Sequence, residues 1–125
     1  MSGDVLHLNV DDLVRYSGLA VESHPSLLAE ILSIFLETTP KTMARLHEAM
    51  AKGDLNAVSR TMHSLKGTVG TFGAAKLAAL CKHLNEELRQ GHVPENLPAR
   101  VDEIKEEYDA VCCDMQRLLE VWQTE

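Results

Sequence analysis

A histidine and a lysine lie one helical turn apart in the segment TMHSLKGTVGTFGA, residues 61–74. A neutral imidazole is a nucleophile at neutral pH, and histidine is among the residues that form covalent intermediates in group transfer. A lysine on the same helix face can neutralise the negative charge of a phosphoryl group attached to that ring. His63 and Lys66 therefore indicate a surface histidine that accepts a phosphoryl group.

Three glycines accompany this pair, Gly67, Gly70 and Gly73, although a glycine inside a helix costs about 1 kcal/mol relative to alanine. With about 100° of rotation per residue, they fall on the same arc of the helix as His63. The apolar residues form a separate stripe that we expect to face the core: Val58, Met62, Leu65, Val69 and Phe72. Because glycine has no side chain, the arc leaves an open approach to the imidazole, which predicts that an external partner docks there.

Positive charge is concentrated around the motif. No Asp or Glu occurs between Asp54 and Glu86, in a chain that has nineteen acidic residues and a net charge of −7. The basic residues of this stretch are Arg60, Lys66, Lys76 and Lys82. They predict a local electropositive surface suited to an anionic group or to an acidic pocket of a partner protein. The overall negative charge argues against nucleic acid as a partner, because phosphate backbones are bound by basic surfaces.

The elements that carry these residues are predicted to be helices of a single domain, residues 1–125. Ala, Leu, Glu and Lys are abundant and only 4% of the residues are aromatic, which favours helices over a β-sandwich. Helical spacing predicts long helices from Pro25 to Gly53 and over about 55–72, 74–90 and 98–122. Pro40 should kink the first of them, because proline removes a backbone hydrogen bond and its ring clashes with the preceding turn.

A shorter helix is predicted near the N-terminus, where Asn9 or Asp11 is a candidate N-cap and Gly18 is a stop signal. The last long helix alternates apolar spacings of three and four residues, which is the seam of a bundle packed at shallow angles. The predicted fold class is therefore all-α, an antiparallel four-helix bundle with a short additional N-terminal helix.

The three cysteines, Cys81, Cys112 and Cys113, lie inside helical patterns and have neither a disulfide framework nor a metal-ligand spacing. We interpret them as reduced, cytosolic thiols and expect no metal site. No leader and no long apolar run is seen, so we expect a cytoplasmic domain without direct membrane contact. A module excised from a membrane-bound parent would look the same.

Residues 63–85, HSLKGTVGTFGAAKLAALCKHLN, resemble the signature of histidine-containing phosphotransfer (HPt) domains, which reads approximately HxLKGxxxxxGxxxLxxxCxxLE. The matching positions are His63, Leu65, Lys66, Gly67, Gly73, Leu77, Cys81 and Leu84. The preceding helix is also similar, with its proline and the Gly-Asp before the motif helix, so the resemblance covers roughly residues 10–90. Asn85 departs from the pattern, since relatives often carry the longer Glu or Gln there.

This resemblance implies a four-helix phosphorelay intermediate of two-component systems. Such domains take a phosphoryl group from the aspartate of one receiver domain and give it to the aspartate of another. By this resemblance His63 is phosphorylated, Lys66 stabilises the phosphoryl group and Gly67 leaves space for the docked receiver. The other expected docking residues are Ser59, Arg60, Gly70, Lys82 and Asn85.

Partners and cofactors follow from the same resemblance. Response-regulator receiver domains are the expected partners, with a hybrid sensor histidine kinase as a further candidate. We expect no cofactor of the chain's own, because the receivers supply Mg²⁺ and most of the catalytic apparatus. The sequence has no ATP-binding glycine boxes, so we expect a phosphotransfer module and not an autonomous kinase.

Two other functions are left open by the residues. A domain of the same fold could bind or sequester a receiver without transferring phosphate, although His63, Lys66 and Gly67 together disfavour that loss. A small helical-bundle enzyme or ligand carrier could use His63 as a base, although no carboxylate partner for an acid–base pair is apparent. The sequence also leaves open whether the domain is free-standing or the C-terminal module of a hybrid kinase.

Overall fold

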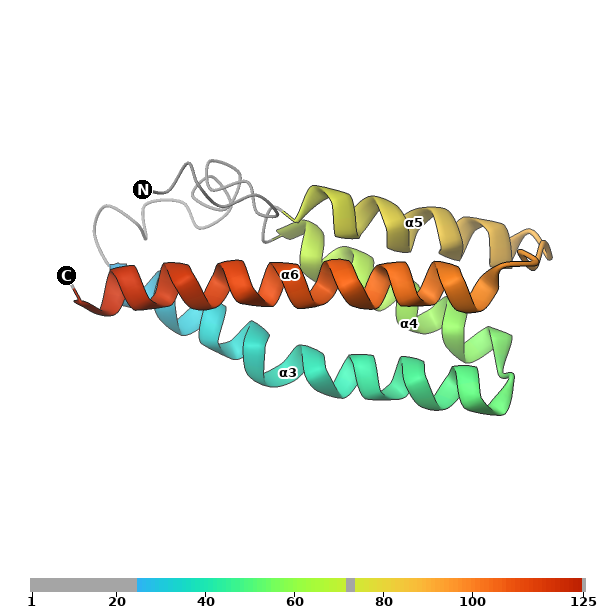
Figure 1. Cartoon of the computed structure of the whole chain (residues 1–125), viewed down its shortest axis with the longest axis horizontal. Coiled ribbons are helices and arrows are strands. Elements are labelled where there is room, and N and C mark those ends of the chain that lie inside the picture. The colour runs from blue at the N-terminus through green and yellow to red at the C-terminus, as the bar shows by residue number, and fades with distance from the viewer. Residues whose placement is uncertain (1–24, 72–73, 125) are drawn as a thin grey trace.

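Four helices make up the part of the chain that the computed structural model describes, residues 25–71 and 74–124. They are α3 (Pro25–Lys52), α4 (Leu55–Thr71), α5 (Ala75–Arg89) and α6 (Leu97–Thr124). Each helix contacts two neighbours, and the pairs α3–α4, α4–α5, α5–α6 and α6–α3 close into a bundle (Figure 1). The predicted all-α four-helix fold is confirmed for these residues. The short helix predicted between Asn9 and Gly18 lies outside the described residues.

The helix ends follow from local chemistry. Gly53 has φ +68° and ends α3, a left-handed conformation that glycine adopts without steric cost. The next residue, Asp54, caps α4, because its Oδ1 accepts a hydrogen bond from the Ala57 backbone N–H at 3.1 Å. Gly91, with φ +80°, ends α5 in the same way, and the N–H of His92 returns to the Glu87 carbonyl at 2.9 Å. These short connections make sequential helices antiparallel neighbours.

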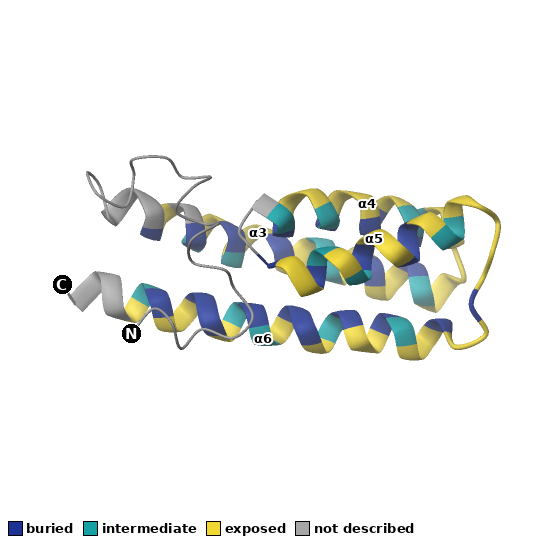
Figure 2. Cartoon of the chain, turned by 90° about the horizontal axis from the view of Figure 1, so that it is seen from above, coloured by how far each residue is buried: buried dark blue, intermediate teal, exposed yellow. Residues whose placement is uncertain are grey.

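The core lies between the four helices. On α4, the predicted stripe of Val58, Met62, Leu65 and Val69 is at most 1% exposed, while Phe72 lies outside the described residues. The seam of α6 is buried as well, and Figure 2 shows its buried residues on the side that faces the other helices. The buried seam residues are Val101, Ile104, Tyr108, Val111, Met115 and Leu118. Because the apolar faces are buried, the polar faces of the helices form the surface on which a functional site can lie.

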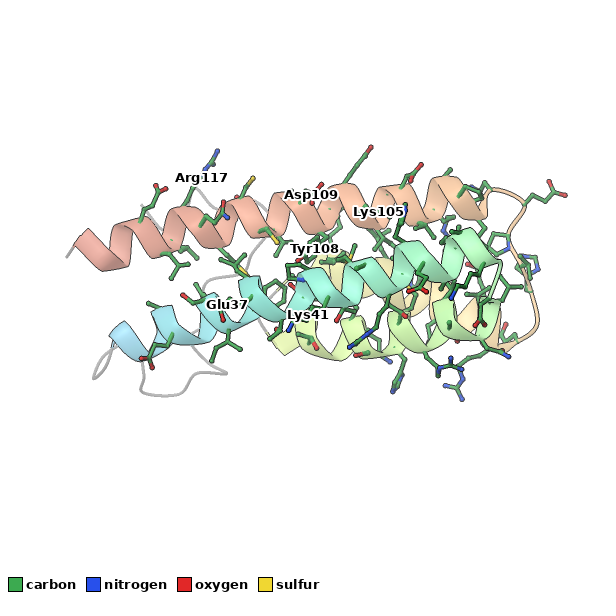
Figure 3. The ribbon with its side chains drawn as sticks, turned by 90° about the horizontal axis from the view of Figure 1, so that it is seen from below. Glu37, Lys41, Lys105, Tyr108, Asp109 and Arg117 are labelled. Atoms are coloured by element: carbon green, nitrogen blue, oxygen red, sulfur yellow. The ribbon has the colours of Figure 1, made fainter. Side chains whose placement is uncertain are left out.

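Helix α3 continues through Pro40, and Figure 1 shows it bending about midway along its length. Pro40 has no N–H to donate to the preceding turn, which weakens the ladder at that point. Thr39, next to Pro40, links α3 to α6. Its hydroxyl donates to the Phe35 carbonyl at 2.7 Å and is hydrogen-bonded to the Tyr108 hydroxyl at 2.7 Å. Figure 3 shows Tyr108 between α6 and α3, so this buried pair fixes the bent helix against α6.

Candidate functional site

His63 lies on the exposed side of α4, at the edge of an open hollow between α4 and α5. The lining residues are Ser59, Arg60 and His63 from α4 and Asn85 and Arg89 from α5. None of them is acidic, so every charge that lines the hollow is positive. Such a surface suits an anionic group, as the charge pattern of the sequence predicts.

Two of the lining residues are bonded to each other across the helix pair. The Ser59 hydroxyl donates to Asn85 Oδ1 at 2.9 Å. Asn85 is only 2% exposed, whereas Ser59 is half-buried. This bond joins the base of the hollow and holds α4 and α5 at a defined spacing beside His63.

The imidazole of His63 is accessible. Among the residues that the structure describes, no side chain is hydrogen-bonded to it, and Asn85, the residue at the position of the family's longer side chain, bonds Ser59 instead. An exposed ring without a protein partner can turn to meet an incoming group. Geometry therefore permits His63 to act as a nucleophile towards a partner that approaches from outside.

The glycines clear the approach without serving the packing of the bundle. A Cβ built at Gly67 meets nothing within 4 Å, and a Cβ at Gly70 meets only the Ala78 Cβ, at 4.0 Å. Neither glycine is required by the monomer for close helix contact, although Gly70 borders α5. Gly73 lies outside the described residues.

The four basic residues of the acid-free stretch lie at different distances from the hollow beside His63. Arg60 lines the hollow, and Lys66 is half-buried on α4 one turn after His63. Lys82 is exposed on α5 but does not line the hollow. Lys76 faces α6, where its Nζ lies 3.7 Å from Oε1 of the buried Glu107. Of these four residues, Arg60 lines the hollow, whereas Lys76 is turned towards α6.

Arg89 is the lining residue that the sequence analysis missed. It lies one helical turn after Asn85 on α5, and this i, i+4 spacing from Asn85 is the signal that could have found it. The nearby Glu87 is paired with Arg100 of α6 at 2.7 Å, and the hydrogen bond from Arg100 lowers the pKa of its carboxyl group. Glu87 is thus turned to the opposite side of α5 and leaves Arg89 beside the hollow.

No three His, Cys, Asp or Glu side chains come together as metal ligands within the described ranges. Over the same residues, no helix has an apolar stretch long enough to cross a membrane.

The family model of the Hpt domain matches residues 30–112, which include the whole motif helix and its partner α5. The chain belongs to the Hpt domain family. Hpt domains carry out histidine phosphotransfer in two-component phosphorelays, and the resemblance seen in residues 63–85 is confirmed. Hpt domains are intermediates of this transfer and not kinases.

Solved and curated Hpt proteins share the fold and part of the sequence. The crystal structure of histidine-containing phosphotransfer protein B (HptB) from Pseudomonas aeruginosa PAO1 superposes with a TM-score of 0.79 at 28% identity, covering 91% of this chain and 95% of that one. Histidine-containing phosphotransfer protein 2 of Arabidopsis thaliana is 29% identical over 79 residues, 61% of this chain and 51% of that protein.

A third relative is a much larger protein. The signal transduction histidine-protein kinase BarA of Shigella flexneri is 25% identical over 93 residues, which is 74% of this chain and 10% of the kinase. The Hpt domain described here thus spans a tenth of that kinase and about half of the plant protein.

Proposed function

We propose that this Hpt domain accepts a phosphoryl group on His63 from the aspartate of one receiver domain and passes it to the aspartate of another. The observation that carries the proposal is the exposed imidazole of the family motif at the edge of a hollow lined only by neutral and cationic groups. Phosphoryl transfer needs positioning and charge stabilisation more than covalent chemistry from the protein, and this surface offers both.

The transfer balances without an added proton. The lone pair of the unprotonated ring nitrogen forms the N–P bond, and the P–O bond to the receiver's aspartate breaks with its electron pair on the carboxylate. The proton on the other ring nitrogen stays where it is. Attack by the carboxylate of a second receiver reverses these changes and regenerates the neutral imidazole.

In this proposal, the residues of this chain bind the phosphoryl group and the receiver, and the receiver brings the metal ion and the aspartate. Lys66, Arg60 and Arg89 are the cations that would neutralise the transferred group, and Gly67 and Gly70 are the open face on which the receiver would lie. We infer that Mg²⁺ and the acceptor aspartate come from the receiver, and that Lys82 contacts the receiver at the rim. The domain would then act in the cytoplasm as a transfer module without turnover of its own.

The direct test is phosphate labelling. Receiver domains are phosphorylated with radiolabelled acetyl phosphate and Mg²⁺, freed of the small molecule and mixed with this protein. We expect acid-labile, base-stable label on the wild type and none on His63→Gln. The matched control is His83→Gln, which changes another exposed histidine outside the hollow and should leave labelling intact.

Two results would separate the alternatives. Equal labelling of His63→Gln and the wild type contradicts the assignment of His63. Receiver binding without any label on the wild type would instead support the sequestering module.

A further inference from the structure

A second depression lies on the side of α4 that faces α3. This groove between α3 and α4 has a volume of about 350 Å³. Two of its lining residues, Ala49 and Thr61, are buried and form its floor, while longer side chains stand along its rims. The groove shares one lining residue, Arg60, with the hollow beside His63. It therefore borders the surface on which the receiver is proposed to lie.

The two acidic side chains that line the groove are already engaged locally. Glu48 Oε1 lies 2.7 Å from Lys52 Nζ, in an i, i+4 ion pair along α3. Asp54 caps α4 by accepting the hydrogen bond from the Ala57 backbone N–H. Both carboxylates, and the lysine among the three cations of the groove, thus have partners within the α3–α4 segment.

The two arginines of the groove have no such partner. Arg45 comes from α3 and Arg60 from α4, and both are exposed. Neither forms an ion pair with any carboxylate of the residues that the structure describes. A guanidinium presents its N–H donors in a planar fork that matches the two oxygens of a carboxylate. Two unpaired arginines in one groove are therefore complementary to an acidic side chain of a partner.

We propose that an Asp or Glu side chain of the docked receiver enters the groove between α3 and α4 and is bound there by Arg45. The inference rests on the proposed function and names the surface chemistry that selects the receiver. Arg45 does not line the hollow beside His63, so it acts on recognition of the receiver and not on the transferred group. Charged contacts of this kind speed association and disfavour partners that carry the wrong charge.

Two phosphoryl donors separate recognition from chemistry. Phosphoramidate labels the imidazole without a receiver, whereas a phosphorylated receiver domain must dock first. We expect Arg45→Gln to take phosphate from phosphoramidate at the wild-type rate. From the receiver that labels His63, it should take phosphate about fivefold more slowly at low salt. The difference should shrink as salt is added, because exposed charges are screened.

Two further variants separate the groove from the net charge of the protein. Arg117→Gln removes the same charge from α6, where Figure 3 shows Arg117 pointing away from the other helices, and it should transfer normally. Glu48→Gln releases Lys52 from its ion pair and adds an unpaired cation to the groove, so transfer from the receiver should be faster than in the wild type at low salt. Titration calorimetry with the same receiver should give the same order of affinities.

Equal transfer rates in Arg45→Gln and the wild type would overturn the contact, as would equal slowing by Arg45→Gln and Arg117→Gln, which would reflect net charge alone. A rate in Glu48→Gln no higher than in the wild type would contradict an acidic occupant. Self-association of the wild type that Arg45→Gln abolishes would assign the groove to a second copy of this chain instead. These outcomes leave phosphorylation of His63 intact. A chain that takes phosphate from phosphoramidate but from no phosphorylated receiver contradicts the proposed function itself.

Discussion

Gly67 is the residue whose type the monomer itself does not explain. A side chain there would meet nothing within 4 Å, and the backbone needs no left-handed conformation at this position. A helix-interior glycine nevertheless costs about 1 kcal/mol relative to alanine. The proposed docking of a receiver against this part of α4, one turn from His63, would explain why a side chain is absent here.

Substitution of Gly67 should separate folding from docking. In Gly67→Leu, we expect a free energy of unfolding up to about 1 kcal/mol higher than in the wild type, because leucine is a good helix former. Binding to the receiver that labels His63 should fall at least tenfold by titration calorimetry, because a bulky side chain stands where the partner would lie. The control Thr68→Leu adds bulk at the next, solvent-facing position and should bind normally. Undiminished binding by Gly67→Leu would contradict the docking role of this face.

At the scale of elements, the tight α3–α4 turn fixes where α3 ends and α4 begins. Gly53 ends one helix and Asp54 caps the next, with the Asp54 N–H bonded to the Ala49 carbonyl at 2.9 Å. The connection between α3 and α4 is therefore short, and the two helices pack against each other. On the other side of α4, the Ser59–Asn85 hydrogen bond joins it to α5.

Loss of this cap should destabilise the fold without abolishing its chemistry. We expect Asp54→Ala to lower the free energy of unfolding by about 1 kcal/mol, since an N-terminal N–H of α4 loses its acceptor. Asp54→Asn, which keeps a side-chain oxygen, should lose much less. Urea titration gives the stability, and phosphoramidate labelling of His63 at low temperature should be unchanged. A neutral Asp54→Ala result would mean that the Asp54 contact contributes nothing to helix initiation.

At the scale of the whole molecule, the core of the bundle includes a buried thiol. Cys81 is fully buried and belongs to the hydrophobic core of the bundle, and burial raises the pKa of its thiol to about 12. In the unfolded chain a cysteine ionises near its reference pKa of about 8.5. The unfolded state therefore releases this proton first, so the contribution of Cys81 to stability is complete below about pH 8.5 and is lost as the pH rises towards the folded value.

Alkylation tests this core directly. With iodoacetamide at mildly alkaline pH, we expect rapid modification of the exposed Cys113 in the native protein and modification of Cys81 only in urea, because the thiolate is the reactive form. Peptide mass spectrometry locates the label. Rapid native labelling of Cys81 would show that the bundle opens on the timescale of the reaction.

The helices and their buried faces could be predicted from residue types and spacing. Gly53, Asp54 and Gly91 mark helix boundaries by local chemistry, and the apolar stripes of α4 and α6 repeat at helical intervals, so neither required knowledge of distant residues. The motif likewise pointed to His63 before any fold was known. The pairing of Lys76 with Glu107 could not be predicted in this way, because it depends on which helix lies beside α5.

By itself, the sequence determined the helical class, the core stripes and the family to which the chain belongs, since these depend on local periodicity and on a contiguous motif. The base of the hollow was decided only by the tertiary structure. Ser59 and Asn85 are far apart in the chain, and their hydrogen bond, like the arrival of Arg89 beside His63, requires that α4 and α5 pack at one particular rotation. That rotation is set by the whole core at once, because every buried side chain must be accommodated together.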